Sequence, residues 1–263
     1  MQYKLVVLDM DGTLLDDNHQ VSDKNKEAIN KLKSRGINVA LASGRPFESI
    51  YPYAKELEIN TPIIATNGSL VKCPVTKKVY SSTVLPTNFA KEIIEYGMEN
   101  EYCISLYLNE EVHTFHERMV KVHYDLEKLH AKLIDTIDEE KDIYKIIYSH
   151  TAEKIEDAFE ILHGKYNKVM YITRSDDIYL DIMHSNVSKG LAIEQLMSML
   201  KISQSEVVVM GNSYNDIAMF HVANLSVAMG NSPQEVKEAA DFVSTSNDDD
   251  GVAYAIEKYI FGA

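Results

Sequence analysis

The sequence has few cysteines and no long apolar run. Its two cysteines, Cys73 and Cys103, lie apart and match no metal-ligand or redox spacing, so a secreted disulfide framework is not expected. No apolar run approaches the roughly 20 residues that a membrane-spanning helix needs. The apolar run at residues 5–8 is also too short for the core of a signal peptide. These absences predict a cytoplasmic protein.

Basic residues are also scarce. The 263 residues include 26 Lys and Arg against 40 Asp and Glu, a formal net charge of −14. Nucleic acids and anionic membranes are bound through basic patches, so this balance argues against both as partners. An anionic substrate would have to be held by a few local cations. Hydrophobic residues make up 45% of the chain, which is ordinary for a globular protein of one large or two modest domains.

The first and last thirds of the chain alternate between short apolar runs and helical segments. Runs such as residues 206–210 (EVVVM) are typical of parallel strands that are buried on both faces. Strand–helix alternation of this kind predicts an α/β fold with a doubly wound, Rossmann-like parallel sheet. The expected strands are residues 3–9, 37–43, 62–66, 206–210 and 225–228, and the expected helices begin after Ser22, near Arg45, after Ser188, near Asn215 and after Pro233.

The middle of the chain mixes helices and strands without regular alternation. A turn at residues 175–177 separates two strand-like runs, which indicates a hairpin. We therefore predict two domains, an α+β domain at residues 83–186 inserted into a core made of residues 1–82 and 187–263. The predicted helices of the insertion are residues 87–99 and 152–162, and its predicted strands are residues 103–108, 143–149, 168–173 and 178–183.

Polar residues follow the predicted strands at the place where open parallel sheets bind their ligands, beyond the carboxyl ends. These residues are Asp9 to Thr13 after the first strand, Ser43-Gly44-Arg45 after the second, Lys189 at a helix start, and Gly211 to Asp216 after residues 206–210. Each motif alone is also typical of an ordinary turn. Their joint occurrence, in this order and at these places, indicates one active site.

The motifs DMDGTLLD, ALASGRP, VSKG and GNSYND resemble those of the haloacid dehalogenase superfamily of phosphohydrolases. The similarity is closest to the Cof-type branch, in which a large α+β cap lies between the second and third motifs. The segments TNGSLV, YLDIMHSNVSKG and NDDDGVAYAIEKY are also similar to that branch. The resemblance therefore covers nearly the whole chain.

The resemblance implies a phosphatase that works through an aspartyl-phosphate. Asp9 would be the nucleophile and a metal ligand, and Asp11 would protonate the leaving oxygen and later deprotonate the attacking water. The Asp11 backbone carbonyl, rather than its carboxylate, would contact the metal. Ser43, Gly44 and Lys189 would bind the transferring phosphoryl group and neutralise its charge.

The same resemblance implies a Mg²⁺ site, since oxygen ligands with few carboxylates suit this ion. Asn215 would bind phosphate or hold its loop, and Asp216 would complete the surroundings of the metal. Asn212 stands where the family usually has an acidic metal ligand. An amide oxygen can still bind the metal but brings no charge, so weaker Mg²⁺ binding, a shift of the direct contact to Asp216, or loss of activity would follow.

Three further residues are candidates for substrate contacts. Arg45 could reach phosphate or a substrate carboxylate, or it could pair with a surface acid. Asn67 could touch the substrate or only tighten the turn after residues 62–66. Arg174, near the predicted hairpin turn, could hold a substrate group or be a solvated charge.

We therefore expect a Mg²⁺-dependent phosphohydrolase for small phosphorylated metabolites, sugar phosphates first among them, with nucleotides, pyridoxal phosphate and flavin mononucleotide also open. One alternative is a phosphotransferase or phosphomutase that uses the same Asp9. Another is a weakly active regulatory protein that binds phosphometabolites. We expect a monomer or homodimer, with no nucleic-acid or membrane partner.

Overall fold

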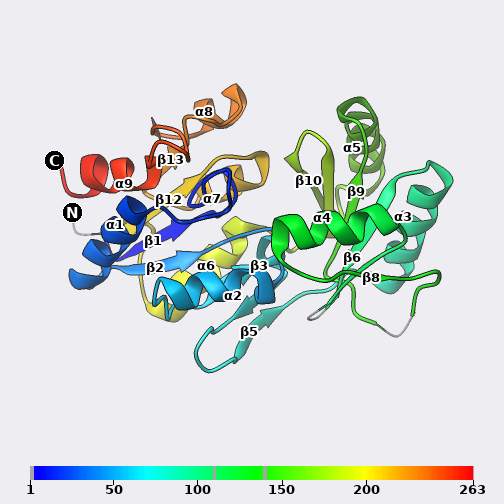
Figure 1. Ribbon diagram of the computed structural model, residues 1–263, viewed down its shortest axis with the longest axis horizontal. Coiled ribbons are helices and arrows are strands. Elements are labelled where there is room, and N and C mark those ends of the chain that lie inside the picture. The colour runs from blue at the N-terminus through cyan, green and yellow to red at the C-terminus, as the bar shows by residue number, and fades with distance from the viewer. Residues whose placement is uncertain (1–2, 109–110, 139–140, 263) are drawn as a thin grey trace.

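In the computed structural model, which describes residues 3–108, 111–138 and 141–262, two lobes lie side by side (Figure 1). One lobe carries both ends of the chain, and the other is formed by its middle. The chain enters the second lobe after β5 (Val79–Ser82) and is back in the first where α6 (Lys189–Leu200) begins. An α/β core with an inserted α+β cap is thus confirmed, whereas the boundaries at 82/83 and 186/187 stay a prediction.

The core is built on a parallel sheet that is covered on both faces. Within the described residues the strand order is β14-β13-β12-β1-β2, and each neighbouring pair is parallel. Alternate residues of β1 face opposite sides, so Val6 and Leu8 belong to one apolar cluster and Leu5 and Val7 to another. This explains why the strands are uninterrupted apolar runs. Their bounds are β1 (Leu5–Leu8), β2 (Asn38–Leu41), β12 (Val207–Gly211), β13 (Leu225–Ala228) and β14 (Phe242–Val243).

Helices cover each face of this sheet. α1, α2 and α9 pack on the side of Val6, and α6, α7 and α8 pack on the side of Val7. Ser22 and Ser188 cap α1 and α6 as predicted, because each hydroxyl accepts a first-turn N–H at 3.1 Å. No helix in the described part of the chain has the length and apolarity to cross a membrane. The bounds are α1 (Asp23–Ser34), α2 (Phe47–Glu56), α6 (Lys189–Leu200), α7 (Ile217–Phe220), α8 (Gln234–Ala239) and α9 (Gly251–Ala255), with short helical turns η2 (Gln204–Glu206), η3 (Tyr214–Asp216) and η4 (Ile256–Ile260).

The third predicted strand, residues 62–66, belongs only in part to the core sheet. β3 (Ile63–Ala65) meets the end of β2 through one bridge, Ala42 to Ile64, and pairs antiparallel with β4 (Leu70–Lys72), which pairs with β5. The chain reverses in the 3₁₀ turn η1 (Thr66–Gly68), where all three residues have positive φ. The strands β4 and β5 were not expected from the sequence.

The cap is a mostly antiparallel sheet with helices. Among the described residues its order is β10-β11-β9-β6-β7-β8, and only the β7–β8 pair is parallel. Ile104, Ile146 and Ile182 pack under α3 and α5 in one apolar cluster. The bounds are β6 (Cys103–Tyr107), β7 (Val112–Thr114), β8 (Lys132–Leu133), β9 (Lys145–Ser149), β10 (Met170–Asp176), β11 (Tyr179–His184), α3 (Thr87–Glu99), α4 (Glu117–Glu127) and α5 (Ala152–Tyr166).

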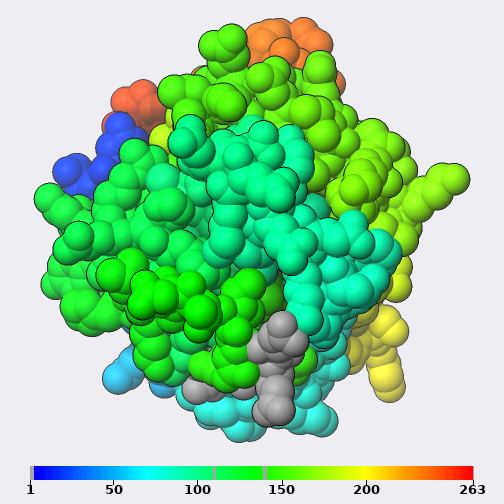
Figure 2. Space-filling view, turned by 90° about the vertical axis from the view of Figure 1, so that its right-hand side faces the viewer, coloured from blue at the N-terminus to red at the C-terminus, as the bar shows by residue number. Residues whose placement is uncertain are grey.

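The second face of the cap sheet is turned toward the core. Side chains alternate along a strand, so Tyr107, Lys145 and Asp181 lie opposite the α3–α5 face, and all three line a cavity between the lobes. Seen from the cap end, the cap fills most of the visible surface in front of the core (Figure 2). The predicted hairpin is confirmed as β10 and β11, whereas α4, β7 and β8 were not predicted.

Gly190, the second residue of α6, lets this helix pack directly against the backbone of α7. A Cβ at Gly190 would overlap the carbonyl oxygen of Ala218. We expect Gly190→Ala to lower the free energy of unfolding by about 2 kcal/mol, because one of the two helices must shift.

The matched control is Gly164→Ala in α5, where a Cβ would meet no described atom within 4 Å. The better helix propensity of alanine should raise stability there by about 0.5–1 kcal/mol. Urea unfolding of both variants measures the difference. Equal stabilities of the two variants would contradict the close packing at Gly190.

Candidate active site

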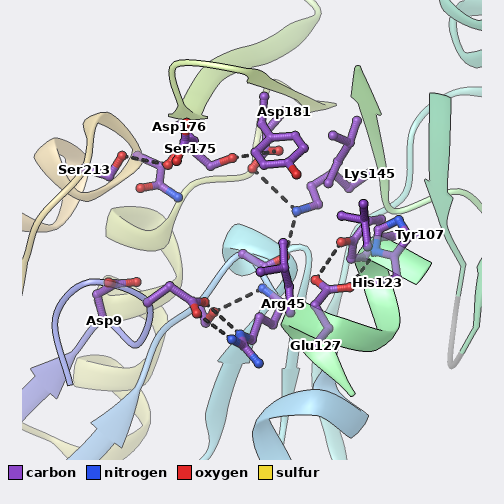
Figure 3. A pocket seen from close by; sticks show the side chains of 18 of the residues that line it. Asp9, Arg45, Tyr107, His123, Glu127, Lys145, Ser175, Asp176, Asp181 and Ser213 are labelled. Atoms are coloured by element: carbon purple, nitrogen blue, oxygen red, sulfur yellow. Dashed lines mark hydrogen bonds and ion pairs between the residues drawn. The ribbon is translucent and has the colours of Figure 1, made fainter. Parts of the chain in front are cut away.

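The carboxyl ends of β1, β2 and β12 bring most of the predicted site residues together. Asp9 directly follows β1, Ser43 lies just beyond β2, and Asn212 directly follows β12. With the cap they enclose a cavity of about 280 Å³ (Figure 3). The predicted residues that line it are Asp9, Asp11, Ser43, Gly44, Arg45, Asn212 and Asn215.

Lys189 joins two buried carboxylates. Its ammonium donates to Asp9 Oδ1 at 2.6 Å and to Asp216 Oδ1 at 2.7 Å. Burial alone would lower the pKa of Lys189, but the charges of Asp216 and Asp9 outweigh burial and raise that pKa. Lys189 is therefore a permanent cation beside the predicted nucleophile.

Asp9 has an unusual pKa for a carboxyl group. Burial and the negative charge of Asp216 raise the pKa of Asp9 to about 7, although Lys189 opposes the shift. One ammonium does not balance two buried carboxylates, so negative charge is in excess here. A cation bound next to Asp9 would remove this excess, and the charge balance therefore fits a divalent metal.

Asp216 is occupied by donors from the protein itself. Its Oδ2 accepts the backbone N–H groups of Asn212 and Ser213 at 2.8 and 2.9 Å, and its Oδ1 accepts from Lys189. The bond from the Ser213 N–H belongs to the capping box of η3. Gly211 permits the approach, because a Cβ there would overlap the Asp216 side chain. Asp216 thus holds the loop that carries Asn212.

One end of the Asn212 amide lies 3.1 Å from Asp9 Oδ2, 2.9 Å from the Asp11 carbonyl oxygen and 3.1 Å from Thr13 Oγ1. A nitrogen at this end would donate to these oxygens. An oxygen there would be repelled by Asp9 and Asp11 unless a cation joined all three. Neighbouring ligands of an octahedral Mg²⁺ with bonds of about 2.1 Å would lie about 3 Å apart, so this spacing fits Mg²⁺.

A metal at this place would rest on a mixed set of oxygens. In the described residues no group of three His, Cys, Asp or Glu side chains gathers as a metal site. A carboxylate, a backbone carbonyl and an amide, completed by water, are nevertheless the hard ligands that Mg²⁺ accepts. The Asp216 oxygens already accept three protein donors, whereas one end of the Asn212 amide lies beside Asp9 and the Asp11 carbonyl.

The buried Arg45 pairs with Asp11, whose side chain is 46% exposed. Its Nε donates to Asp11 Oδ2 at 2.7 Å and its Nη2 to Asp11 Oδ1 at 2.5 Å. Burial would raise the pKa of Asp11, but hydrogen bonds with Arg45 and His19 outweigh burial and hold that pKa well below its usual value. Asp11 is thus ionised in this arrangement, the state in which a carboxylate accepts a proton.

Residues 6–256 match the family model of the haloacid dehalogenase-like hydrolases. The chain belongs to this family. A putative phosphatase of Bacillus subtilis, YxeH, is 31% identical over 266 residues, with 98% of both chains covered. The 5-amino-6-(5-phospho-D-ribitylamino)uracil phosphatase YwtE of the same species is 28% identical, covering 98% of this chain and 99% of that protein.

Solved structures agree with this assignment. A haloacid dehalogenase-like hydrolase from Bacteroides thetaiotaomicron superposes with a TM-score of 0.85 at 30% identity, covering 98% of this chain and 99% of that one. The resemblance inferred from the motifs is confirmed. This haloacid dehalogenase-like hydrolase is an enzyme of the phosphatase type.

The cap of this hydrolase contributes a charged pair that sequence reasoning missed. Lys145 Nζ donates to the Gly44 carbonyl at 2.7 Å and lies 3.5 Å from Asp181 Oδ2. Asn67 Nδ2 donates to the same Asp181 oxygen at 2.7 Å, so Asn67 bridges the two lobes. The available signal was a buried charge in each of two apolar strand runs, because such a charge needs a partner.

Tyr107, His123 and Glu127 were missed as well, and they complete the cap side of the cavity (Figure 3). Two of them lie on α4, which was not predicted, so their common face could not be inferred. Arg174 is not among the described residues that line this cavity. Its guanidinium pairs with Glu156 and lies 4.6 Å from the ring centroid of Tyr214, which places it in the contact between cap and core.

Asp9 should limit the stability of the metal-free enzyme at neutral and alkaline pH. Its folded-state pKa of about 7 exceeds the ordinary 3.8, so the folded protein holds this proton more tightly than the unfolded chain does. The contribution of the protonated Asp9 to the free energy of unfolding is complete below pH 3.8, and it is lost as the pH rises through 7. Asp9→Asn, which cannot ionise, should therefore raise the free energy of unfolding at pH 8 by up to about 4 kcal/mol.

Urea unfolding in the presence of a chelator measures this effect at pH 8 and at pH 5. The gain from Asp9→Asn should shrink at pH 5, where wild-type Asp9 keeps its proton. Asp23→Asn is the control, since the Asp23 side chain is 98% exposed. An equal gain at both pH values, or no gain at all, would show that ionisation of Asp9 does not destabilise the folded protein.

Proposed function

We propose that this enzyme hydrolyses phosphate monoesters of small metabolites, sugar phosphates first among them, with Mg²⁺ and through an aspartyl-phosphate on Asp9. The arrangement around Asp9 carries the proposal: a buried carboxylate at a strand end, 2.6 Å from Lys189, with Asp11 lining the same cavity. Residues 83–186 would act as the cap that closes over the substrate. The enzyme would be cytoplasmic and a monomer or homodimer.

In the proposed reaction Asp9 attacks the phosphorus atom. A bond forms from an Asp9 oxygen to phosphorus, the bond from phosphorus to the leaving oxygen breaks, and the leaving oxygen takes a proton from Asp11. Water then attacks the aspartyl-phosphate and gives a proton to Asp11, which releases inorganic phosphate and restores Asp9. Arg45 keeps Asp11 ionised, which suits the second step, so the first step requires the entering substrate to draw Arg45 away.

Charge repulsion is the main obstacle to this attack. A carboxylate and one phosphate charge 4 Å apart repel by roughly 4 kcal/mol at an effective dielectric constant of about 20. Lys189 supplies one opposing charge. Mg²⁺, held by Asp9, the Asp11 carbonyl and Asn212, would neutralise the charge on the phosphoryl oxygens.

Protein donors would bind the transferring phosphoryl group. Lys189 has a third proton beyond those given to its two carboxylate partners. The Ser43 hydroxyl accepts from the Arg45 N–H at 3.1 Å, so its own hydrogen can point to the substrate. Asn215 Nδ2 has a second proton beyond its bond to Asn67. With the Gly44 N–H these groups would form an electrostatic cradle for the transition state.

Two observations support a phosphorylated polyol or sugar as the substrate. The cavity of about 280 Å³ lies at the lower limit for small-molecule sites. The relative YwtE is named for a phosphorylated ribityl compound, in which the phosphate ends a polyol chain. A phosphorylated polyol or sugar therefore fits both the size of the cavity and the name of that relative.

Phosphate release from p-nitrophenyl phosphate and from a panel of sugar phosphates, measured with Mg²⁺, tests the proposal. Asp9→Asn should reduce phosphate release to below about 1% of wild type, because the nucleophile is gone. Asp23→Asn, the same change at an exposed position, should keep full activity. An Asp9→Asn variant that folds and still releases phosphate at a tenth of the wild-type rate would rule out the covalent mechanism.

Asn212→Asp should lower the Mg²⁺ concentration needed for half-maximal activity by about tenfold, because hard divalent cations favour charged oxygens. The change in KM for substrate should be smaller and in the opposite direction, since the added charge repels phosphate. Mg²⁺ titrations of both proteins at fixed pH measure the two effects. Superimposable titrations would show that Asn212 is not a metal ligand.

A further inference from the structure

The cap closes the cavity with three carboxylates and one ammonium. Glu127, Asp176 and Asp181 line it from the cap together with Lys145 (Figure 3). Three negative charges against one positive charge leave −2, with His123 counted as neutral. We call Glu127, Asp176 and Asp181 the acidic roof.

The ammonium beside the acidic roof is already paired. Lys145 donates to the Gly44 carbonyl and lies 3.5 Å from Asp181. A second anionic group on a substrate would have to break this pair to bind Lys145. Breaking a buried pair leaves the other charge without a partner, which is strongly unfavourable.

Glu127 is held so that it cannot turn away from the cavity. Tyr107 Oη donates to its Oε1 at 2.7 Å, and His123 Nδ1 lies 2.8 Å from its Oε2. His123 Nε2 is in turn 2.8 Å from Ser105 Oγ. The backbone carbonyl of Glu127 also accepts from Ser49 of the core at 2.7 Å. The carboxylate therefore faces an entering leaving group from a fixed position.

The carboxylate of Asp181 accepts hydrogen bonds and orders two amides of the core. Asp181 accepts from Asn67 Nδ2 at 2.7 Å, and Asn67 Oδ1 accepts from Asn215 Nδ2 at 3.0 Å. An ionised carboxylate can only accept, so Asp181 fixes the orientation of both amides. Asn215, which is 5% exposed, also lines the cavity, and its buried Oδ1 has no hydrogen-bond partner among the described residues.

We propose that the acidic roof selects phosphate monoesters whose leaving group is uncharged or cationic and carries hydroxyl or amino donors, and that it rejects esters with a second anionic group. This inference rests on the proposed phosphatase function and specifies its substrate class. One additional negative charge about 7 Å from an unbalanced carboxylate, at an effective dielectric constant of about 20, lowers kcat/KM on the order of 10- to 100-fold. The acidic roof would thus repel esters with a second anionic group, in addition to accepting hydrogen bonds from the preferred substrate.

A pair of substrates that differ only in the distal charge tests the proposal. Sorbitol 6-phosphate and 6-phosphogluconate share one carbon chain and differ at the far end, a hydroxymethyl group against a carboxylate. Sorbitol 6-phosphate should have the higher kcat/KM by about 10- to 100-fold. Glucosamine 6-phosphate, with its ammonium group, should be hydrolysed at least as well as glucose 6-phosphate.

Charge-removing variants connect this preference to the acidic roof. Glu127→Gln should reduce the preference for sorbitol 6-phosphate by about tenfold, mainly by improving 6-phosphogluconate. Asp176→Asn is a second variant at an exposed position, where an asparagine can still accept from Ile178 N–H, and it should act in the same direction. Glu117→Gln, the same change on the exposed start of α4, is the control and should leave the preference unchanged.

Failure of this inference and failure of the proposed function give different results. Equal kcat/KM for the two substrates, or a preference that neither roof variant alters, would overturn the acidic roof and leave the phosphatase intact. No hydrolysis of any ester would instead overturn the proposed function. Calorimetric titration of the Asp9→Asn variant with both compounds then still tests the roof, which requires tighter binding of sorbitol 6-phosphate.

Discussion

The catalytic edge of this protein depends on one lysine shared by two buried carboxylates. Lys189 reaches Asp9 and Asp216 because Gly190 lets α6 approach α7 and Gly211 leaves room for the Asp216 side chain. One positive charge against two negative charges is an incomplete balance, and it raises the pKa of Asp9. This excess of negative charge lowers the free energy of unfolding of the metal-free protein. It also favours the binding of a cation. The raised pKa of Asp9 and the loss of stability predicted at high pH therefore have one electrostatic cause.

Buried charges also determine how the cap contacts the core. Its strands bury isoleucines under α3 and α5 on one face, and the alternation of side chains brings Lys145 and Asp181 to the other face. Because those charges lie in the contact between the lobes, they are bonded to Gly44 and Asn67 of the core. The proposed reaction thus takes place at the core strand ends, and the cap contributes charged side chains to the other wall of the cavity.

The strands and helices that carry the motifs were predictable, because a buried parallel strand and a capped helix are local patterns. β4 and β5 were not, since they form only where η1 turns the chain back onto β3 through positive φ values. The helix α4 was missed as well: its buried residues are Met119 and His123, an apolar and a polar side chain that form no uniform apolar run. The pairing of Arg45 with Asp11 depends on contact between two loops that the sequence separates by 34 positions.

The sequence by itself determined the family, the parallel core with its inserted cap, and the identity of the residues at the strand ends. Short motifs and periodic apolar runs indicate all three. Only the tertiary structure decided how the charges are paired. Arg45 binds Asp11, Asn212 rather than Asp216 lies beside the Asp11 carbonyl, Arg174 lies outside the cavity, and three cap carboxylates face the substrate space. The physical reason is that electrostatic interaction depends on distance and burial in space, and neither can be read from positions along the chain.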